Sequence, residues 1–254
     1  MYIDLNSDLG ESFGRYRIGN DEAIVPLVTS VNAACGFHAG DPVVMMKTVA
    51  LAESSGTAIG AHPGFDDLQG FGRRNVVLSH DELRSCILYQ LGALDAFAKD
   101  AGTKLQHIKL HGAMYNMAAK DAEMSEVICR AVKSFNSDLI ILAQGSGETL
   151  RVARDLGMRA AAEVFADRAY NEDGTLVARS RPDSMITDPD VAIKRVIRMI
   201  TEGKVEAVTG KDIDIKADSV CVHGDGEKAL EFVKSLRNAF VQYKIDLAPL
   251  RSFI

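Results

Sequence analysis

The sequence has few of the features that mark membrane-bound, secreted or nucleic-acid-binding proteins. It contains no tryptophan, only four cysteines in 254 residues, and no C-x-x-C pair. No apolar run approaches the length of a membrane span, and the first residues lack the charged leader and apolar segment of a signal peptide. No basic run occurs, and the net charge is −6. We therefore expect reduced cysteines, a cytoplasmic location, and neither nucleic acid nor membrane as a partner.

Several catalytic signatures are also missing. Gly145-Ser-Gly147 lacks both the G-K-[ST] ending of a P-loop and the third glycine of a dinucleotide fingerprint, so it is interpreted as a turn at a helix start. The absence of a G-x-S-x-G elbow argues against a serine hydrolase. Asp4, Asp8 and Glu11 could bind a divalent metal with nearby histidines, but there is no H-E-x-x-H or other fixed ligand spacing. We therefore assign no metal ligand from the sequence.

What is present is a regular alternation of strands and helices. Strand-like segments at 2–9, 31–38, 57–62, 106–111, 138–143, 159–165 and 219–223 are separated by helical ones, one of which is predicted to start at the capping box Ser79-His-Asp-Glu82. The segment Gly112-Ala-Met-Tyr-Asn116, directly after the fourth strand, is predicted as a loop. No repeat, low-complexity segment or Pro/Ser-rich linker interrupts them. The pattern predicts one domain over residues 1–254 with a parallel sheet and helices around it. Our first choice is an irregular (β/α) barrel of about seven parallel strands, and a doubly wound open sheet is second.

Four of these strands carry polar residues on one face, which is unusual for a parallel sheet. Asp4, Asn6 and Asp8 alternate with apolar neighbours, and so do Lys109 and His111. The other polar members are His107, Glu163, Asp167, Cys221, His223 and Asp225. Strands of ordinary parallel sheets are apolar on both faces, and burying an unpaired charge costs several kcal/mol. A shared functional pocket is favoured over a set of internal ion pairs, because barrel active sites form at the carboxyl ends of the strands.

The candidates for acid–base chemistry lie at strand ends. His38 ends the second predicted strand and Asp41 follows it, where Asp41-Pro42 is also suited to capping a helix. The remaining candidates are His62, Lys109, His111 and His223, with Asp8 as a further base. His80 is interpreted as a solvated residue at a helix start, and His107 as lying too low on its strand. The loop arginines Arg73, Arg168 and Arg179 could bind a carboxylate or phosphate, whereas Arg181 is better explained by surface solubility.

Six motifs in order give the chain a close, nearly end-to-end resemblance to the LamB/YcsF family. They are Asp4-Leu-Asn-Ser-Asp-Leu-Gly-Glu11, Asn32-Ala-Ala-Cys-Gly-Phe-His-Ala-Gly-Asp-Pro42, Gly60-Ala-His-Pro63 with Gly70-Phe-Gly-Arg-Arg74, Lys109-Leu-His-Gly-Ala-Met-Tyr-Asn116, Glu163-Val-Phe-Ala-Asp-Arg-Ala-Tyr170 and Cys221-Val-His-Gly-Asp225. The resemblance implies a barrel related to those of glycoside hydrolases and polysaccharide deacetylases. It also implies ATP-dependent opening of the 5-oxo-L-proline lactam to L-glutamate, ADP and phosphate.

The same resemblance implies ATP as cosubstrate, a divalent cation such as Mg²⁺ accompanying it, and 5-oxoprolinase subunits B and C as partners. A homo-oligomer is also compatible. The expected catalytic set is Asp8, His38, Asp41, His62, Lys109, His111 and His223. The expected substrate-binding set is Asp4, Asn6, Glu11, Arg73, Asn116, Glu163, Asp167, Arg168, Tyr170, Arg179 and Asp225. Which residue is base and which is acid stays open.

Two other functions are compatible with the sequence. One is a metal-dependent amidase or deacetylase that acts alone, and the other is a non-catalytic subunit that binds substrate or partners. The location of the ATP site is not predicted, because no nucleotide motif is present.

Overall fold

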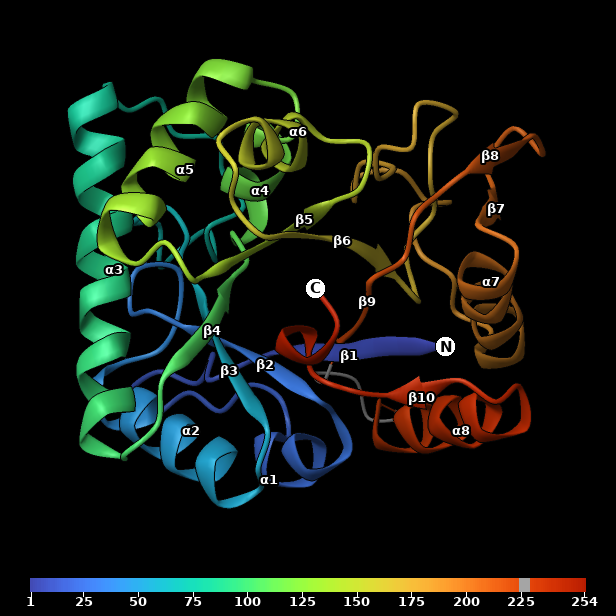
Figure 1. The fold of residues 1–254 in the computed structure, drawn as a ribbon, viewed down its shortest axis with the longest axis horizontal. Coiled ribbons are helices and arrows are strands. Elements are labelled where there is room, and N and C mark those ends of the chain that lie inside the picture. Colours follow the sequence, from blue (N-terminus) through green and yellow to red (C-terminus); the bar gives the residue numbers. More distant parts are fainter. Residues whose placement is uncertain (224–228) are drawn as a thin grey trace.

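The computed structural model describes residues 1–223 and 229–254, and its centre is a closed barrel of parallel strands (Figure 1). The barrel strands are β1 Tyr2–Leu9, β2 Ser30–Ala34, β3 Ala58–His62, β4 Leu105–Ile108, β5 Ile140–Gln144, β6 Ala160–Phe165 and β9 Ser219–His223. Each strand pairs with the next, and β9 pairs with β1 from Asp4↔Ser219 to Asp8↔His223. This last pairing closes the sheet. The predicted seven-stranded barrel is therefore confirmed, and the open sheet is excluded.

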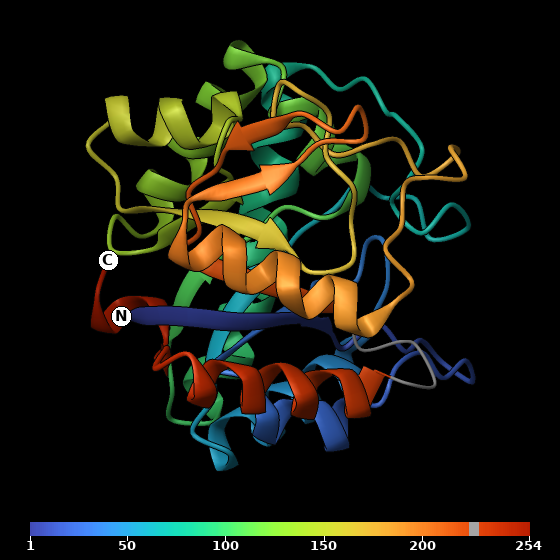
Figure 2. The ribbon, with the colours of Figure 1, turned by 90° about the vertical axis from the view of Figure 1, so that its right-hand side faces the viewer.

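Helices surround the barrel, and capping side chains fix where several of them begin. The helices are α1 Asp21–Ile24, α2 Pro42–Ser54, α3 His80–Asp100, α4 Gly112–Ala118, α5 Ala122–Phe135, α6 Glu148–Asp155, α7 Pro189–Thr201 and α8 Ala229–Gln242, with short 3-10 turns η1 Val25–Leu27 and η2 Leu250–Ser252. Ser79 and Glu82 form the predicted capping box of α3, and Asp41 and Asp188 cap α2 and α7. Figure 2 shows α7 and α8 running side by side along the outside of the barrel.

Four parts of the fold differ from the sequence prediction. The second strand, predicted over 31–38, is β2 and ends at Ala34. The strand predicted over 106–111 ends at Ile108, after which only β3 still pairs with the chain, through Lys109 N–H to Ala61 C=O and His111 N–H to Pro63 C=O. The loop expected after His111 is helix α4. The small strands β7 Lys204–Glu206 and β8 Asp212–Asp214, which form an antiparallel hairpin, and β10 Asp246–Leu247, which pairs with β1, were not predicted.

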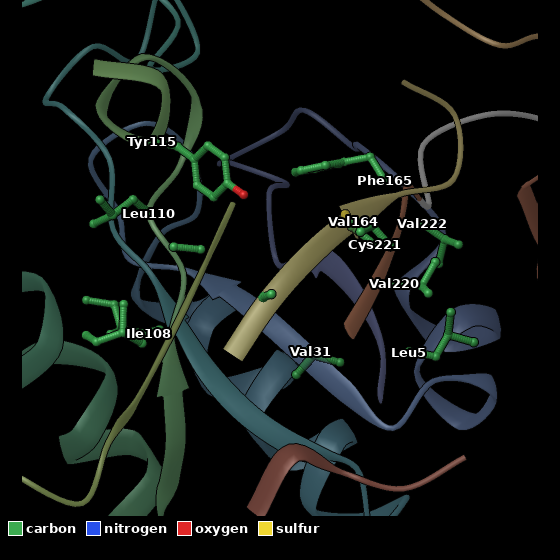
Figure 3. Packing of buried hydrophobic residues seen from close by; sticks show 14 of the residues in the cluster. Leu5, Val31, Ile108, Leu110, Tyr115, Val164, Phe165, Val220, Cys221 and Val222 are labelled. Atoms are coloured by element: carbon green, nitrogen blue, oxygen red, sulfur yellow. The ribbon is translucent and has the colours of Figure 1, made fainter. Parts of the chain in front are cut away.

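The two faces of the strands have opposite chemical character. Apolar residues such as Leu5, Val31 and Val220 are buried between the barrel and the helices (Figure 3). Inside the barrel, a separate cluster of Ile140, Leu142, Ala161 and Leu250 fills the end where η2 lies. The chain ends meet at this end, where the rings of Tyr2 and Phe253 stack at 6.2 Å (Figure 2). None of the helices in the described part of the chain is long and apolar enough to cross a membrane.

Between that apolar cluster and the opposite end, a column of buried polar side chains runs through the barrel. Ser219 Oγ donates to Asp4 and accepts a hydrogen bond from Asn6. Asn32 Nδ2 lies 2.7 Å from Asn6 Oδ1 and 2.8 Å from Asp8 Oδ1. His107 Nε2 lies 2.7 Å from Asn32 Oδ1. These bonds satisfy polar groups that burial would otherwise penalise, so the polar inner face is compatible with a folded core.

Gly60 has a packing role in this column. A Cβ atom at position 60 would lie 2.1 Å from Nε2 of His107, a distance that no side chain can accommodate. The His107 ring thus fits against bare backbone, and burial lowers its pKa to about 3. It is neutral and below the pocket, as its position on the strand predicted.

Candidate active site

A pocket of about 340 Å³ opens at the carboxyl ends of the barrel strands. Nine of the residues predicted to form a site line it: Asp8, Glu11, His62, Arg73, Lys109, His111, Asn116, Arg168 and Arg179. They come from strands β1 and β3 and from the segments that follow β1, β3, β4 and β6. The barrel therefore brings together residues that are up to 171 positions apart, from Asp8 to Arg179.

Lys109 occupies the floor of this pocket and is almost completely buried. Its ammonium Nζ lies 2.8 Å from Asp8 Oδ1, 2.7 Å from Glu163 Oε1 and 3.2 Å from Cys221 Sγ. It also lies 5.3 Å from the ring centre of Phe165. Burial opposes a charge on Lys109, but Asp8, Cys221 and Glu163 raise its pKa well above the ordinary value. Lys109 is therefore a fixed cation that faces two carboxylates.

Glu163 is held by a second partner besides Lys109. Its Oε2 accepts a hydrogen bond of 2.9 Å from the hydroxyl of Tyr115, which reaches into the barrel from α4. Figure 3 shows this hydroxyl directed toward the side of the barrel where Phe165 lies. Burial raises the pKa of Glu163, while Lys109 opposes that rise. Lys109 and Tyr115 thus fix both oxygens of this carboxylate at the pocket floor.

Three histidines form a compact group beside Lys109. The rings of His38 and His111 stack at 3.6 Å with an interplanar angle of 4°, and His62 meets both edge-on. His62 Nδ1 lies 2.8 Å from the backbone oxygen of Lys109, and His111 Nε2 lies 2.8 Å from that of Phe71. The inner nitrogens, His62 Nε2 and His111 Nδ1, lie 3.0 Å apart. Burial lowers the pKa of His38 and His111 well below the ordinary value, so both are neutral.

A carboxylate completes this group. Glu11 Oε1 lies 3.2 Å from His38 Nε2 and 3.6 Å from His111 Nδ1. One donor atom from each of Glu11, His38, His62 and His111 lies within 4.8 Å of the other three. The four residues could therefore hold a metal ion, although they come from four separate segments of the chain.

Three arginines give the pocket positive charge. Arg168 is buried and donates to the backbone oxygen of Val177, while Arg73 and Arg179 are exposed at the mouth. Burial, and then the neighbouring charge of Arg179, lower the pKa of Arg168 to about 10. Like charges held close together in this way attract an anion such as a carboxylate or phosphate.

Other residues predicted for the site lie away from the pocket lining. Asp4 and Asn6 lie deeper in the barrel, in the polar column. Asp41 caps α2, where Oδ1 accepts from the N–H groups of Val43 and Val44 and Oδ2 accepts from Gly14 N–H. These hydrogen bonds account for both oxygens of the Asp41 carboxylate.

The hydroxyl of Tyr170 is buried and accepts from Phe165 N–H, so it supports the end of β6. Asp167 is partly buried just after β6, and its backbone oxygen accepts from Ile186 N–H. His223 ends β9 beside Asp8, and only its backbone placement is described. Asp225 lies outside the described residues.

The sequence interpretation missed several residues of the site. Phe71, Tyr115, Gln144 and Phe165 all line the pocket. Gln144 is the last residue of β5, one position beyond the predicted end of that strand, so the strand-end argument would have found it. Tyr115 lies in a segment predicted as loop, and its inward direction depends on α4. Phe71 has a positive φ of 54° in the loop after β3, and no periodic pattern points to it.

Comparison with known proteins gives a consistent result. The model of the LamB/YcsF family matches residues 3–254. A protein of Clostridium beijerinckii, named as the A subunit of 5-oxoprolinase, is 55% identical over 251 residues, which cover 98% of each chain. The crystal structure of a lactam utilization protein from Thermus thermophilus has a TM-score of 0.92 and 44% identity, with 98% of this chain and 99% of that one covered.

More distant structures share the fold alone. A family 4 carbohydrate esterase from Streptomyces lividans has a TM-score of 0.50 and 10% identity over 96% of this chain and 90% of its own. This likeness shows a shared barrel fold.

Proposed function

This chain belongs to the LamB/YcsF family, and from that premise we propose that it is the A subunit of an ATP-dependent 5-oxoprolinase, which opens the lactam of 5-oxo-L-proline to L-glutamate together with its B and C subunits. The observation that carries the proposal is the 55% identity over 98% of both chains to a protein of that name. The pocket supports it, because cations, carboxylates and imidazoles there suit an anionic cyclic amide.

The proposed chemistry follows from the stability of the substrate. A five-membered lactam is a poor electrophile, so coupling to ATP makes its opening favourable. Transfer of the γ-phosphoryl group to the lactam oxygen releases ADP and gives an imidate-like phosphate. Water adds to the ring carbon, the C–N bond breaks with a proton going to nitrogen, and an acyl phosphate of glutamate remains. A second water then releases phosphate and leaves the carboxylate.

Lys109 is the residue best placed to stabilise negative charge at the reacting carbon or phosphate. It is a buried cation of fixed position, and electrostatic stabilisation by preorganised groups is worth more in a site that excludes water. Asp8 contacts both Lys109 and His62, so we assign it as the base for the attacking water. His111 or His62 would supply the proton to the leaving nitrogen.

The arginines account for the other end of the substrate. The carboxylate of 5-oxoproline needs a cation, and Arg168 with Arg179, which line the same pocket as Lys109, would supply it. We place Arg73, which lies 5.0 Å from the ring centre of Phe71, near the transferred phosphate. ATP and an accompanying Mg²⁺ enter as part of this proposal, and which of the three proteins binds the nucleotide is left open.

Omission of single components tests this function. This chain and the purified B and C subunits are mixed with 5-oxoproline and ATP, and glutamate and ADP are both quantified. The proposal expects glutamate only in the complete mixture, in a fixed ratio to ADP. Glutamate from this chain alone without ATP would instead show a stand-alone amidase. Undiminished glutamate formation by the B and C subunits without this chain would show that it is not catalytic.

A further inference from the structure

The group formed by Glu11, His38, His62 and His111 has the composition of a metal-binding site. Its donor atoms converge within 4.8 Å, and the three imidazoles are at most 5% exposed. Four donors around an ion at zinc–ligand distances of about 2.1 Å lie roughly 3.4 Å apart. Three of the six separations between the donor atoms, 3.0, 3.2 and 3.6 Å, bracket that value, and all six are within 4.8 Å.

The hydrogen bonds around the rings fix which nitrogens carry protons. A backbone carbonyl can only accept, so His62 carries its proton on Nδ1, facing Lys109 O, and His111 carries its proton on Nε2, facing Phe71 O. In the neutral rings, His62 Nε2 and His111 Nδ1 are therefore both bare acceptors. They nevertheless face each other at 3.0 Å, with Glu11 Oε1 3.6 Å from His111 Nδ1. Two lone pairs and a carboxylate oxygen turned toward one point are stabilised by positive charge between them, which a bound metal ion or a proton on His62 Nε2 would supply.

The surroundings hold the rings in this orientation. Metal-binding histidines generally donate their second N–H to a carbonyl or carboxylate, and both His62 and His111 do so here. Gly72 has a positive φ of 61°, and a Cβ at that position would lie 2.6 Å from His38 Cβ and 2.8 Å from His111 Cδ2. The loop after β3 can therefore pack directly on the two stacked rings. The fold thus holds His62 and His111 in place, whereas the His38 ring, which lies parallel to that of His111 at 3.6 Å, would turn for its nitrogen to face the same ion.

We propose that Glu11, His38, His62 and His111 bind one divalent transition-metal ion, with Zn²⁺ the best match to three imidazoles and one carboxylate. Mg²⁺ is a poor match, because it prefers oxygen ligands and retains its water. This site is distinct from the Mg²⁺ that would accompany ATP. The binding itself is independent of the proposed function, whereas its use in catalysis rests on that function.

The position of the site indicates how such an ion would contribute to lactam opening. Glu11, His62 and His111 line the pocket, so the ion would face the same space as Lys109. Asp8 Oδ2 lies 3.4 Å from His62 Nε2, close enough to accept a proton from water bound beside it. A bound Zn²⁺ lowers the pKa of its water toward neutrality, which suits attack on a carbon activated by phosphorylation.

Metal binding by the isolated full-length chain tests the proposal without any activity assay. The chain is treated with a chelator, dialysed, and titrated with Zn²⁺, and Co²⁺ is added separately for its visible spectrum. Metal content is measured after gel filtration. The variants are His111→Asn and Glu11→Gln, and the matched control is His80→Asn, which changes an exposed histidine outside the group. Circular dichroism confirms the fold of each variant.

We expect one equivalent of Zn²⁺ in the wild type and in His80→Asn, with a tetrahedral Co²⁺ spectrum and a higher Tm when loaded. Both site variants should bind at least about 100-fold more weakly, because loss of a ligand should cost at least as much as loss of its supporting partner. Absence of a bound equivalent in the wild type, or equal binding by His111→Asn and His80→Asn, would overturn the proposal. If Zn²⁺ does not bind but the complete complex forms glutamate, the metal site is refuted and the proposed function is not.

Discussion

The ammonium of Lys109 lies 2.8 Å from one oxygen of Asp8, whose other oxygen lies 3.4 Å from His62 Nε2. A single carboxylate therefore joins the buried cation of the pocket floor to the histidine group. The catalytic roles proposed for this pocket depend on that link, because it holds a base between a group that stabilises charge and a group that transfers protons.

Removal of the Lys109 charge should destabilise the fold as well as the site. Lys109→Met leaves the buried carboxylate of Glu163 and the partly buried carboxylate of Asp8 without their cation, which costs about 3–5 kcal/mol in comparable buried pairs. Urea unfolding at pH 8 measures the loss. The double variant Lys109→Met/Glu163→Gln removes one orphaned charge and should recover part of the stability without recovering activity. A loss below about 1 kcal/mol for the single variant would show that the pair is not desolvated.

The arginine side of the pocket predicts a defect in substrate binding. Arg179→Ala should raise the KM for 5-oxoproline about 10- to 100-fold with a smaller change in kcat, since a hydrogen bond to a charged group contributes about 1.5–3 kcal/mol. Steady-state kinetics of the reconstituted complex provide the values. Arg181→Ala is the matched control, because Arg181 is exposed, paired with Asp183 and outside the pocket lining. Equal KM values for the two variants would remove Arg179 from the substrate site.

Two variants of Asp41 distinguish a structural role of this residue from a catalytic one. Its carboxylate accepts three backbone N–H bonds, so Asp41→Ala should lower the free energy of unfolding by about 1 kcal/mol through loss of the helix cap. Asp41→Asn keeps a capping oxygen and should be close to wild type in both stability and kcat. Chemical denaturation and turnover are measured on both variants. Loss of turnover in Asp41→Asn with normal stability would restore the catalytic assignment made from the sequence.

The buried Asp4 predicts a pH dependence of stability. Burial raises its folded-state pKa from 3.8 to about 6, so the folded state binds more protons than the unfolded state between these values. Its contribution to stability is therefore fully present below pH 4 and is lost as the pH rises through 6, by about 3 kcal/mol at 1.36 kcal/mol per pKa unit. Asp4→Asn should remove this loss. The test is to measure the free energy of unfolding of the wild type and of Asp4→Asn from pH 4 to 7. The same pH dependence in both proteins would contradict the effect of Asp4 burial.

The alternation of polar and apolar residues predicted much of the barrel and its pocket. In a strand with one face packed on helices, every second residue must point into the barrel, so Asp8, Glu163 and Lys109 had to share its interior. The carboxyl ends of parallel strands meet at one end, which brought His62 and His111 beside them. This reasoning does not determine how far along the barrel axis a side chain lies. Asp4 and Asn6 point into the barrel as predicted, but they lie too far from the pocket to line it.

Features that depend on loops and on tertiary packing could not be predicted in this way. The four proposed metal ligands lie on four segments, so no spacing in the sequence identifies them. Phe71 faces the pocket because of its loop conformation, and Tyr115 because α4 starts at Gly112. The strands β7, β8 and β10 have only two or three residues each, which is too few to show the alternation of polar and apolar residues that predicts a strand.

The central claim is that the pocket around Lys109 and His111 is where the lactam is opened. The most direct measurement is the rate of glutamate formation by the complex of this chain with the B and C subunits, reconstituted with Lys109→Ala, His111→Ala or the control His80→Ala, each checked for fold by circular dichroism. We predict that both pocket variants abolish ATP-coupled glutamate formation and that His80→Ala retains the wild-type rate. Wild-type rates in both Lys109→Ala and His111→Ala would contradict the claim.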